Sequence, residues 1–201
     1  MNAQITTQPA LIVIDVQKGF EDPKWGKRNN PQAEVNIMRM LHAWRAARLP
    51  VFHVKHNSQS LDSPLRPGTI GNEIRDDVAP IAGEPVFDKT VNSAFIGTRL
   101  EVLLREQKVR DLVVVGLTTP HCVSTSVRMA GNLGFTVSVI EDATAAFELS
   151  SHDGKRIAAA DVHYHALAAL SGEFATIKST QACLVAIGEY KPLGQRHIAP
   201  K

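Results

Sequence analysis

Three residues with reactive side chains, Asp15, Lys89 and Cys122, each stand at or just past the end of a short apolar run of the sequence. A cysteine thiol becomes a strong nucleophile when its proton is removed, and a nearby carboxylate can remove it. An ammonium group stabilises the anions that result. If the fold brings these distant positions together, the three side chains could act as a catalytic triad that attacks a carbonyl carbon.

Cys122 lies in the run VVVGLTTPHCVSTSVRMA, where an apolar segment ends in glycine, two threonines and a proline before a helical pattern begins. At the start of that helix, the positive end of the helix dipole would lower the pKa of the thiol, and so would Lys89. The sequence therefore predicts a thiolate at neutral pH. The alternative is a buried and inert thiol, which is our interpretation of Cys183, placed among apolar neighbours in a predicted C-terminal helix.

The elements that must position these residues alternate along the chain, with short β-branched runs between longer segments of helical period. Strands are predicted at residues 10–16, 51–56, 86–89, 112–117, 135–140 and 175–178, and helices at about 31–49, 100–104, 122–133, 153–170 and 180–187. Right-handed crossovers place helices on both faces of such a sheet. The pattern predicts a three-layer αβα fold with a doubly wound, six-stranded, mostly parallel sheet, whose ligands bind at the carboxyl ends of the strands.

The length, composition and net charge of the chain are those expected of a globular protein that binds a small molecule. Apolar residues make up 44% of the 201 residues and charged residues 21%, and residues 1–201 are expected to form a single domain. The net charge is +2, and basic and acidic residues are interspersed along the chain. We therefore predict that the protein binds neither nucleic acid nor a membrane. The first apolar run is too short for a signal peptide, and two distant cysteines indicate free thiols, so we expect a cytoplasmic protein.

Three motifs together resemble the isochorismatase-like cysteine hydrolases, the family that contains nicotinamidases and N-carbamoylsarcosine amidohydrolase. They are IDVQ around Asp15, DKTVNSAF around Lys89 and GLTTPHCV around Cys122, in that order and each at a predicted strand end. The resemblance covers nearly the whole chain and implies that these three residues are the catalytic triad. It also implies a cis peptide between Leu117 and Thr118, and an oxyanion hole formed by the backbone N–H groups of Thr118 and Cys122.

The resemblance also narrows the chemistry. Isochorismatases that cleave a vinyl ether lack the cysteine, so this chain is expected to hydrolyse a small-molecule amide, ureide or carbamoyl C–N bond through a thioester on Cys122. Nicotinamidases hold a metal with an Asp-x-His pair, whereas this chain has HVKHNSQSLD at that place, with His53 and His56 three apart. We therefore predict no metal and no other cofactor. A homo-oligomer, either a dimer or a tetramer, is also implied.

A non-hydrolytic protein that binds a small ligand, or uses its thiol for redox sensing, is the alternative function on the same fold. Five further side chains are candidates for substrate binding: Phe20, Trp25 and Phe95 as apolar pocket walls, Asn92 as a group that orients Lys89 or the substrate, and His121 beside the nucleophile.

Residues 57–85 are rich in serine, proline, glycine and aspartate and are too long for a simple connector, so we predict a lid or a subunit contact there. His163 and His165 lie two apart on a predicted helix, and we interpret both as surface residues.

Overall fold

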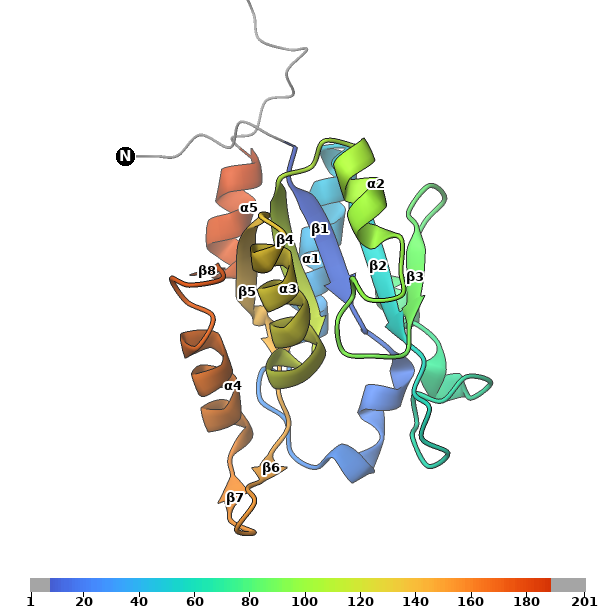
Figure 1. Ribbon diagram of the computed structural model, residues 1–201, viewed down its shortest axis with the longest axis vertical. Coiled ribbons are helices and arrows are strands. Elements are labelled where there is room, and N and C mark those ends of the chain that lie inside the picture. Colours follow the sequence, from blue (N-terminus) through green and yellow to red (C-terminus); the bar gives the residue numbers. More distant parts are fainter. Residues whose placement is uncertain (1–7, 189–201) are drawn as a thin grey trace, which may run out of the picture.

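The computed structural model describes residues 8–188 and has a six-stranded parallel sheet at its centre (Figure 1). The strands lie in the order β3-β2-β1-β4-β5-β8, and every neighbouring pair is parallel. Their bounds are β1 Ala10–Ile14, β2 Val51–His56, β3 Val86–Lys89, β4 Asp111–Leu117, β5 Thr136–Ala145 and β8 Thr176–Lys178. The predicted doubly wound α/β architecture is confirmed.

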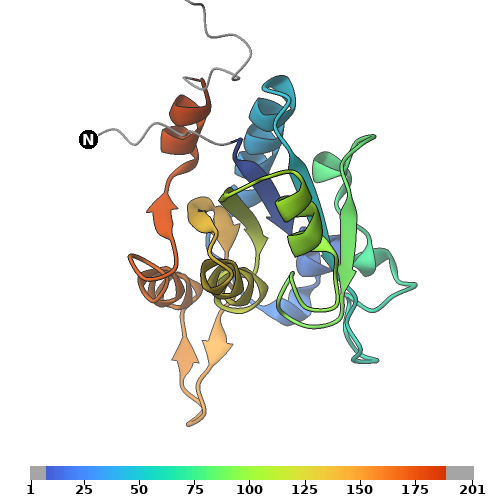
Figure 2. The same cartoon turned by 45° about the horizontal axis from the view of Figure 1, so that its top comes forward.

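Helices cover both faces of the sheet, as the right-handed crossovers require (Figures 1 and 2). They are α1 Ala33–Ala46, α2 Leu100–Glu106, α3 Ser124–Asn132, α4 Ala159–Ala168 and α5 Thr180–Gly188, with short 3-10 turns η1 Lys18–Glu21, η2 Pro23–Trp25, η3 Ile70–Asn72 and η4 Asp76–Val78, and a π-helical turn η5 Thr119–Val123. In the part of the chain that the structure describes, no helix has both the length and the apolar composition needed to cross a membrane.

Side chains alternate between the two faces along each strand, as the two-residue period of a strand requires. In β1, Ile12 and Ile14 join a core shared with α2, α3 and α4, whereas Leu11 and Val13 join a core shared with α1 and α5. Because both faces of β1 are buried, the residues within the strand must be apolar, and a polar residue can be placed only after the strand has ended.

Three predicted elements differ from the structure. The helix expected over 153–170 begins only at Ala159, because residues before it form an antiparallel hairpin of β6 (Leu149–Ser150) and β7 (Arg156–Ile157) that projects from the body (Figures 1 and 2). The helix expected over 122–133 starts with the π-helical turn, so Cys122 lies inside that turn. Strand β5 continues past residue 140 to Ala145, with a register shift against β4 at Gly116.

Gly116 lies opposite Ile14 in the pairing of β4 with β1. Its φ is +121°, and a Cβ atom there would overlap the backbone carbonyl of Ile14. We expect Gly116→Ala to lower the free energy of unfolding by about 3 kcal/mol, measured by urea denaturation. The matched control is Gly134→Ala, where φ is +84° with nothing within 4 Å of the added carbon, and about 1 kcal/mol is expected. Equal losses in the two variants would contradict the close approach of the strands.

Candidate active site

Asp15, Lys89 and Cys122 meet at the carboxyl edge of the sheet. Asp15 directly follows β1, Lys89 is the last residue of β3, and Cys122 lies in the turn after β4. The Lys89 Nζ atom is 2.7 Å from Asp15 Oδ2 and 3.3 Å from Cys122 Sγ. The side chains of Asp15 and Lys89 are fully buried. The structure therefore brings the three predicted residues together, with Asp15 and Cys122 both within hydrogen-bonding distance of the Lys89 ammonium.

Asp15 is placed to accept a proton. Only its Oδ2 atom binds Lys89; no group of residues 8–188 donates a hydrogen bond to the buried Oδ1 atom. Burial raises the pKa of the carboxyl from 3.8 to about 6, since the loss of water outweighs the opposing effect of the Lys89 ammonium. Asp15 is therefore ionised at neutral pH and is more basic than an exposed aspartate.

The prediction that Cys122 is a thiolate at neutral pH is wrong. Burial, reinforced by the negative charge of Asp15, raises the pKa of the thiol to about 12, although the Lys89 ammonium lowers it. The expectation counted the ammonium and the helix dipole but not the loss of water around a residue that is only 8% exposed. The thiol thus keeps its proton at neutral pH until a base removes it, and the carboxyl of Asp15 is the nearest one.

His56 is a fourth member of this cluster. It ends β2, pairs with Lys89 in the register of β2 and β3, and places its Nδ1 atom 3.0 Å from Lys89 Nζ. No role for His56 was predicted from the sequence. The signal that could have found it is the position, because residues that end neighbouring parallel strands at the same register lie side by side.

The donor atoms of Asp15, His56 and Cys122 lie within 4.8 Å of one another, and carboxylate, imidazole and thiolate are also the ligand types of zinc. The Lys89 ammonium, however, lies within 3.3 Å of all three residues. A metal ion between these donors would have to displace a buried positive charge or be repelled by it. The residues therefore fit the ammonium of Lys89 and do not fit a metal of the nicotinamidase kind.

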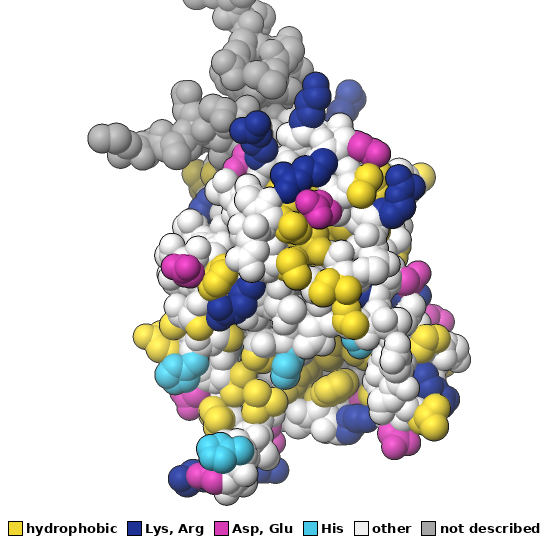
Figure 3. Space-filling model, viewed as in Figure 1, with side chains coloured by type: hydrophobic (Ala, Val, Ile, Leu, Met, Phe, Trp, Pro, Cys, Tyr) yellow, Lys and Arg dark blue, Asp and Glu magenta, His cyan; other side chains and the backbone are white. Residues whose placement is uncertain are grey.

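A cavity of about 370 Å³ opens above Asp15 and Cys122. The rings of Phe20, Trp25 and Phe147 form one wall, with centroids 5.3 to 6.1 Å apart. Figure 3 shows hydrophobic side chains gathered in the lower part of this face of the molecule. The remaining lining residues are Lys24, His56, Leu65, Thr118, Pro120, His121, Glu148 and Leu149. Three of the five candidate substrate-binding residues therefore line the cavity: Phe20, Trp25 and His121.

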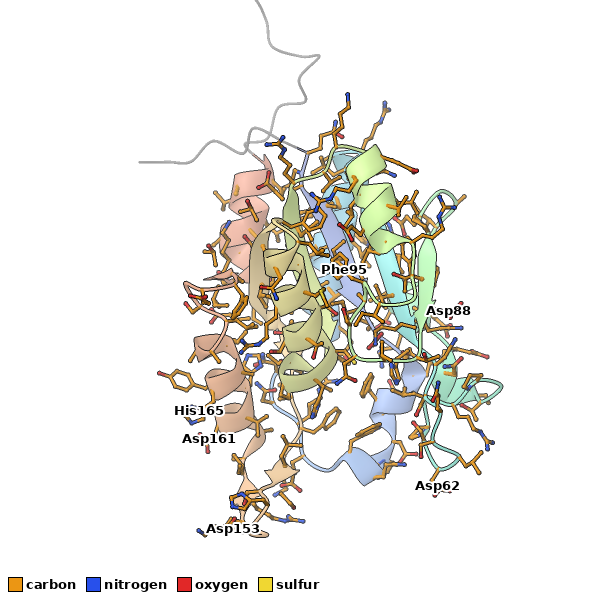
Figure 4. The ribbon with its side chains drawn as sticks, in the orientation of Figure 1. Asp62, Asp88, Phe95, Asp153, Asp161 and His165 are labelled. Atoms are coloured by element: carbon orange, nitrogen blue, oxygen red, sulfur yellow. The ribbon has the colours of Figure 1, made fainter. Side chains whose placement is uncertain are left out.

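The structure does not bring the other two candidates to the cavity wall. Phe95 packs beside the core between the sheet and α2, with its ring centroid 6.1 Å from that of Phe135 (Figure 4). Asn92 is exposed, but its Oδ1 atom is 3.9 Å from Cys122 Sγ. Asn92 is therefore close to the sulfur, whereas Phe95 contributes to the core.

Residues 57–85, predicted to be a lid or a subunit contact, pack against the strand ends. Leu65 lines the cavity, and the buried Asn72 donates hydrogen bonds to the backbone oxygens of His56 and Leu65 and to the side chain of Asn57. One buried amide therefore ties this segment to the carboxyl end of β2, and the segment forms part of the cavity wall.

The turn that carries the sulfur is held at several points. The peptide bond between Leu117 and Thr118 is cis, at the position that the family resemblance implies. The carbonyl oxygen of Thr118 accepts hydrogen bonds from the amides of His121 and Val123, at 3.1 and 3.3 Å. The hydroxyl of Thr118 also bonds to the ring of His121, at 2.9 Å. These bonds fix the backbone on both sides of Cys122.

His163 supports the same turn from α4, which corrects its interpretation as a surface residue. Its Nδ1 atom is 2.8 Å from the buried hydroxyl of Thr119, and the side chain is buried. His165 is exposed as expected and projects from α4 together with Asp161 (Figure 4). The two histidines differ because α4 packs against the turn on the His163 side.

Comparison with known proteins gives one consistent family. Residues 9–182 match the isochorismatase domain. The uncharacterized isochorismatase family protein YrdC of Bacillus subtilis is 47% identical over 85% of this chain and 91% of its own. The ureidoacrylate amidohydrolase RutB of Agrobacterium fabrum is 38% identical, over 70% and 78% of the two chains. An isochorismatase-family protein of Chromobacterium violaceum has a solved structure with a TM-score of 0.90 and 42% identity, covering 94% of this chain and 100% of that one.

Proposed function

This chain belongs to the isochorismatase family, and from that premise we propose that it is a cysteine-dependent hydrolase of a small-molecule amide, ureide or carbamoyl C–N bond. The observation that carries the proposal is the Lys89 ammonium, 2.7 Å from Asp15 and 3.3 Å from Cys122, at the base of a cavity of about 370 Å³. Similarity to an amidohydrolase that acts on ureidoacrylate supports the choice of bond.

Acylation begins with the transfer of a proton from the Cys122 thiol to Asp15 as the sulfur attacks the substrate carbonyl carbon. Because the thiol is protonated at rest, attack and proton transfer must be coupled. The S–C bond forms, the C–N bond breaks, and Asp15 returns the proton to the departing nitrogen as ammonia or an amine leaves. As the proton moves, the negative charge leaves the carboxylate and passes through the sulfur to the substrate oxygen. Lys89 stabilises this charge while it lies on the carboxylate and on the sulfur.

The oxygen of the tetrahedral intermediate is proposed to bind the backbone N–H groups of Thr118 and Cys122. Backbone donors fixed in advance stabilise such an oxygen without reorganisation during the reaction. The hydrogen bonds around Thr118 support this assignment, because they hold the turn rigid on both sides of the sulfur.

In deacylation, water is the nucleophile and the Cys122 sulfur is the leaving group. A water molecule attacks the thioester carbon while Asp15 takes a proton from it. The C–S bond then breaks, the acid product leaves, and the sulfur regains its proton from Asp15. The cycle needs a carboxyl whose pKa lies close to the working pH, and burial gives Asp15 a pKa of about 6.

A screen tests this function directly. Small amides, ureas and carbamoyl compounds are incubated with the protein, ammonia release is measured, and mass spectrometry of the quenched protein locates any acyl adduct. We expect release from at least one compound class and an adduct on the peptide that contains Cys122. An adduct of equal yield on Cys122→Ala would show that another residue is the nucleophile.

The aromatic wall should bind the part of the substrate distant from the reacting bond. We expect Trp25→Ala to raise KM by about tenfold or more with a smaller effect on kcat, since the variant removes a large apolar contact. Kinetics on the best compound of the screen measure this. Phe95→Leu is the matched control and should leave KM within about twofold, because that ring packs in the core. A larger KM effect for Phe95→Leu than for Trp25→Ala would contradict this assignment of the substrate pocket.

Redox sensing through the two thiols is disfavoured by their positions. Cys122 belongs to the core between the sheet and α2, α3 and α4, whereas Cys183 belongs to the core on the α1 and α5 face. The sheet lies between them, so Cys183 cannot act as the resolving thiol without large rearrangement. Thiol titration after peroxide treatment should therefore find no disulfide between these two residues.

A further inference from the structure

Three hydrogen-bond acceptors lie around the buried Lys89 ammonium, one for each of its N–H groups. A protonated lysine has three N–H groups and no acceptor. Around its Nζ atom lie Asp15 Oδ2 at 2.7 Å, His56 Nδ1 at 3.0 Å and Cys122 Sγ at 3.3 Å. His56 therefore supplies the one acceptor of this set that is neither the predicted base nor the predicted nucleophile.

The backbone of His56 is held independently of its ring. The amide of His56 donates to Gln17 Oε1 at 2.9 Å, and its carbonyl accepts from the side chains of Gln17 and Asn72, each at 3.0 Å. Both amide side chains are buried, so they fix the end of β2 against the segments that carry Gln17 and Asn72. A substitution of the ring should consequently leave the backbone in place.

The imidazole of His56 is neutral at neutral pH. Burial, reinforced by the Lys89 ammonium and opposed by a hydrogen bond with the backbone of Val91, lowers its pKa from 6.5 to about 4. With Nδ1 facing an ammonium that can only donate, the ring proton belongs on Nε2. A neutral ring of this tautomer accepts a hydrogen bond from Lys89 without adding charge to the site.

We propose that His56 is a positioning residue, whose Nδ1 atom accepts the third hydrogen bond of Lys89 and so holds the ammonium between the carboxylate and the sulfur. This inference rests on the proposed cysteine hydrolase function, because it assigns His56 a role in activating Cys122. His56 acts through Lys89 and contributes no proton transfer to the reaction.

The consequence of losing this acceptor follows from the groups that face it. Asp15 from the end of β1, Lys89 from β3 and Cys122 from the turn after β4 surround the ring, and His121 lines the same cavity. Without the acceptor, one N–H of a buried ammonium is unsatisfied, so the charged form of Lys89 becomes less stable. The negative charge that develops on the sulfur as the thiol loses its proton is then stabilised less, and the pKa of Asp15 rises.

Alkylation of Cys122 by iodoacetamide tests the inference without a known substrate. All variants carry Cys183→Ala, so that Cys122 is the one thiol left to react. The rate of alkylation is measured from pH 5 to pH 9. His56→Leu removes the acceptor. His56→Asn places an amide oxygen where Nδ1 lies, whereas His56→Gln places it closer to the position of Nε2. Lys89→Met is measured in parallel.

We expect His56→Leu and His56→Gln to react at least about tenfold more slowly at neutral pH, with the midpoint of the acidic limb moved upward. His56→Asn should stay within about threefold of the parent, and it is the variant that separates positioning from simple packing. Should the leucine variant fail to fold, the comparison of asparagine with glutamine carries the test.

Two results would overturn the inference: parental rates in His56→Leu, or equal rescue by glutamine and asparagine. If these occur while Lys89→Met is slow, His56 has no positioning role and the proposed triad stands. If Lys89→Met also reacts at the parental rate, activation by Lys89 is wrong and the proposed function fails with it.

Discussion

Cys122→Ala is expected to lose at least about 10⁴-fold in kcat, because alanine cannot form the thioester on which both halves of the proposed reaction depend. The loss should appear in kcat with little change in substrate binding, since the cavity walls are intact. Steady-state ammonia release measures kcat, and equilibrium binding of the substrate to the inactive variant measures affinity.

The matched control is Cys183→Ala, which removes the other thiol of the chain. Cys183 is buried in α5, 4% exposed, on the opposite face of the sheet from Cys122. We expect parental kcat together with a modest loss of stability from the small cavity that the change leaves. Retained turnover in Cys122→Ala, with a stable fold, would exclude a covalent mechanism at this sulfur.

The sheet was predictable because its strands are short β-branched runs that are buried on both faces. β2 and β3 have the predicted bounds, so His56 and Lys89 fall at strand ends as expected. The parallel arrangement then requires that these ends share one edge. For this reason the convergence of Asp15, Lys89 and Cys122 followed from strand positions alone.

Features set by contacts between elements could not be predicted in this way. The pattern around residue 163 is helical, but only the packing of α4 against the turn at Thr119 shows that His163 is buried. Gly154, with φ of +82°, lies in the loop between β6 and β7, where a continuous helix was expected. Neither arrangement has a periodic signal in the sequence.

The pKa of Cys122 shows the same limit for electrostatics. The residues near the sulfur could be inferred, and the ammonium of Lys89 taken alone predicts a low pKa, whereas the carboxylate of Asp15 acts in the opposite direction. The depth of burial could not be inferred, and it has the larger effect and the opposite sign. This difference changes the mechanism, because a protonated thiol needs a base at the moment of attack. Asp15 is the residue proposed to act as that base.

Asp15→Asn is therefore expected to reduce kcat/KM by about 10³-fold, since an amide keeps the shape of the carboxyl but cannot take the thiol proton. Lys89 can still donate to the amide oxygen, which limits the structural disturbance. In the parent, kcat/KM should fall as the pH decreases through about 6, where the raised pKa of Asp15 lies, because protonation of the carboxyl removes the base. A pH profile of the purified variant and its parent measures both effects.

Glu148→Gln provides the control for the assignment of the acidic limb, because Glu148 is the other carboxylate that lines the cavity. Glu148 is paired with Arg156 at 3.3 Å and is partly exposed, so its neutralisation can alter the magnitude of kcat/KM but not the position of the limb. We expect the limb to stay near pH 6 in Glu148→Gln and to vanish from the residual activity of Asp15→Asn. A limb that persists in Asp15→Asn would assign the titration to another group and would remove Asp15 from the role of base, because burial raises a carboxyl pKa only at the residue that is itself desolvated.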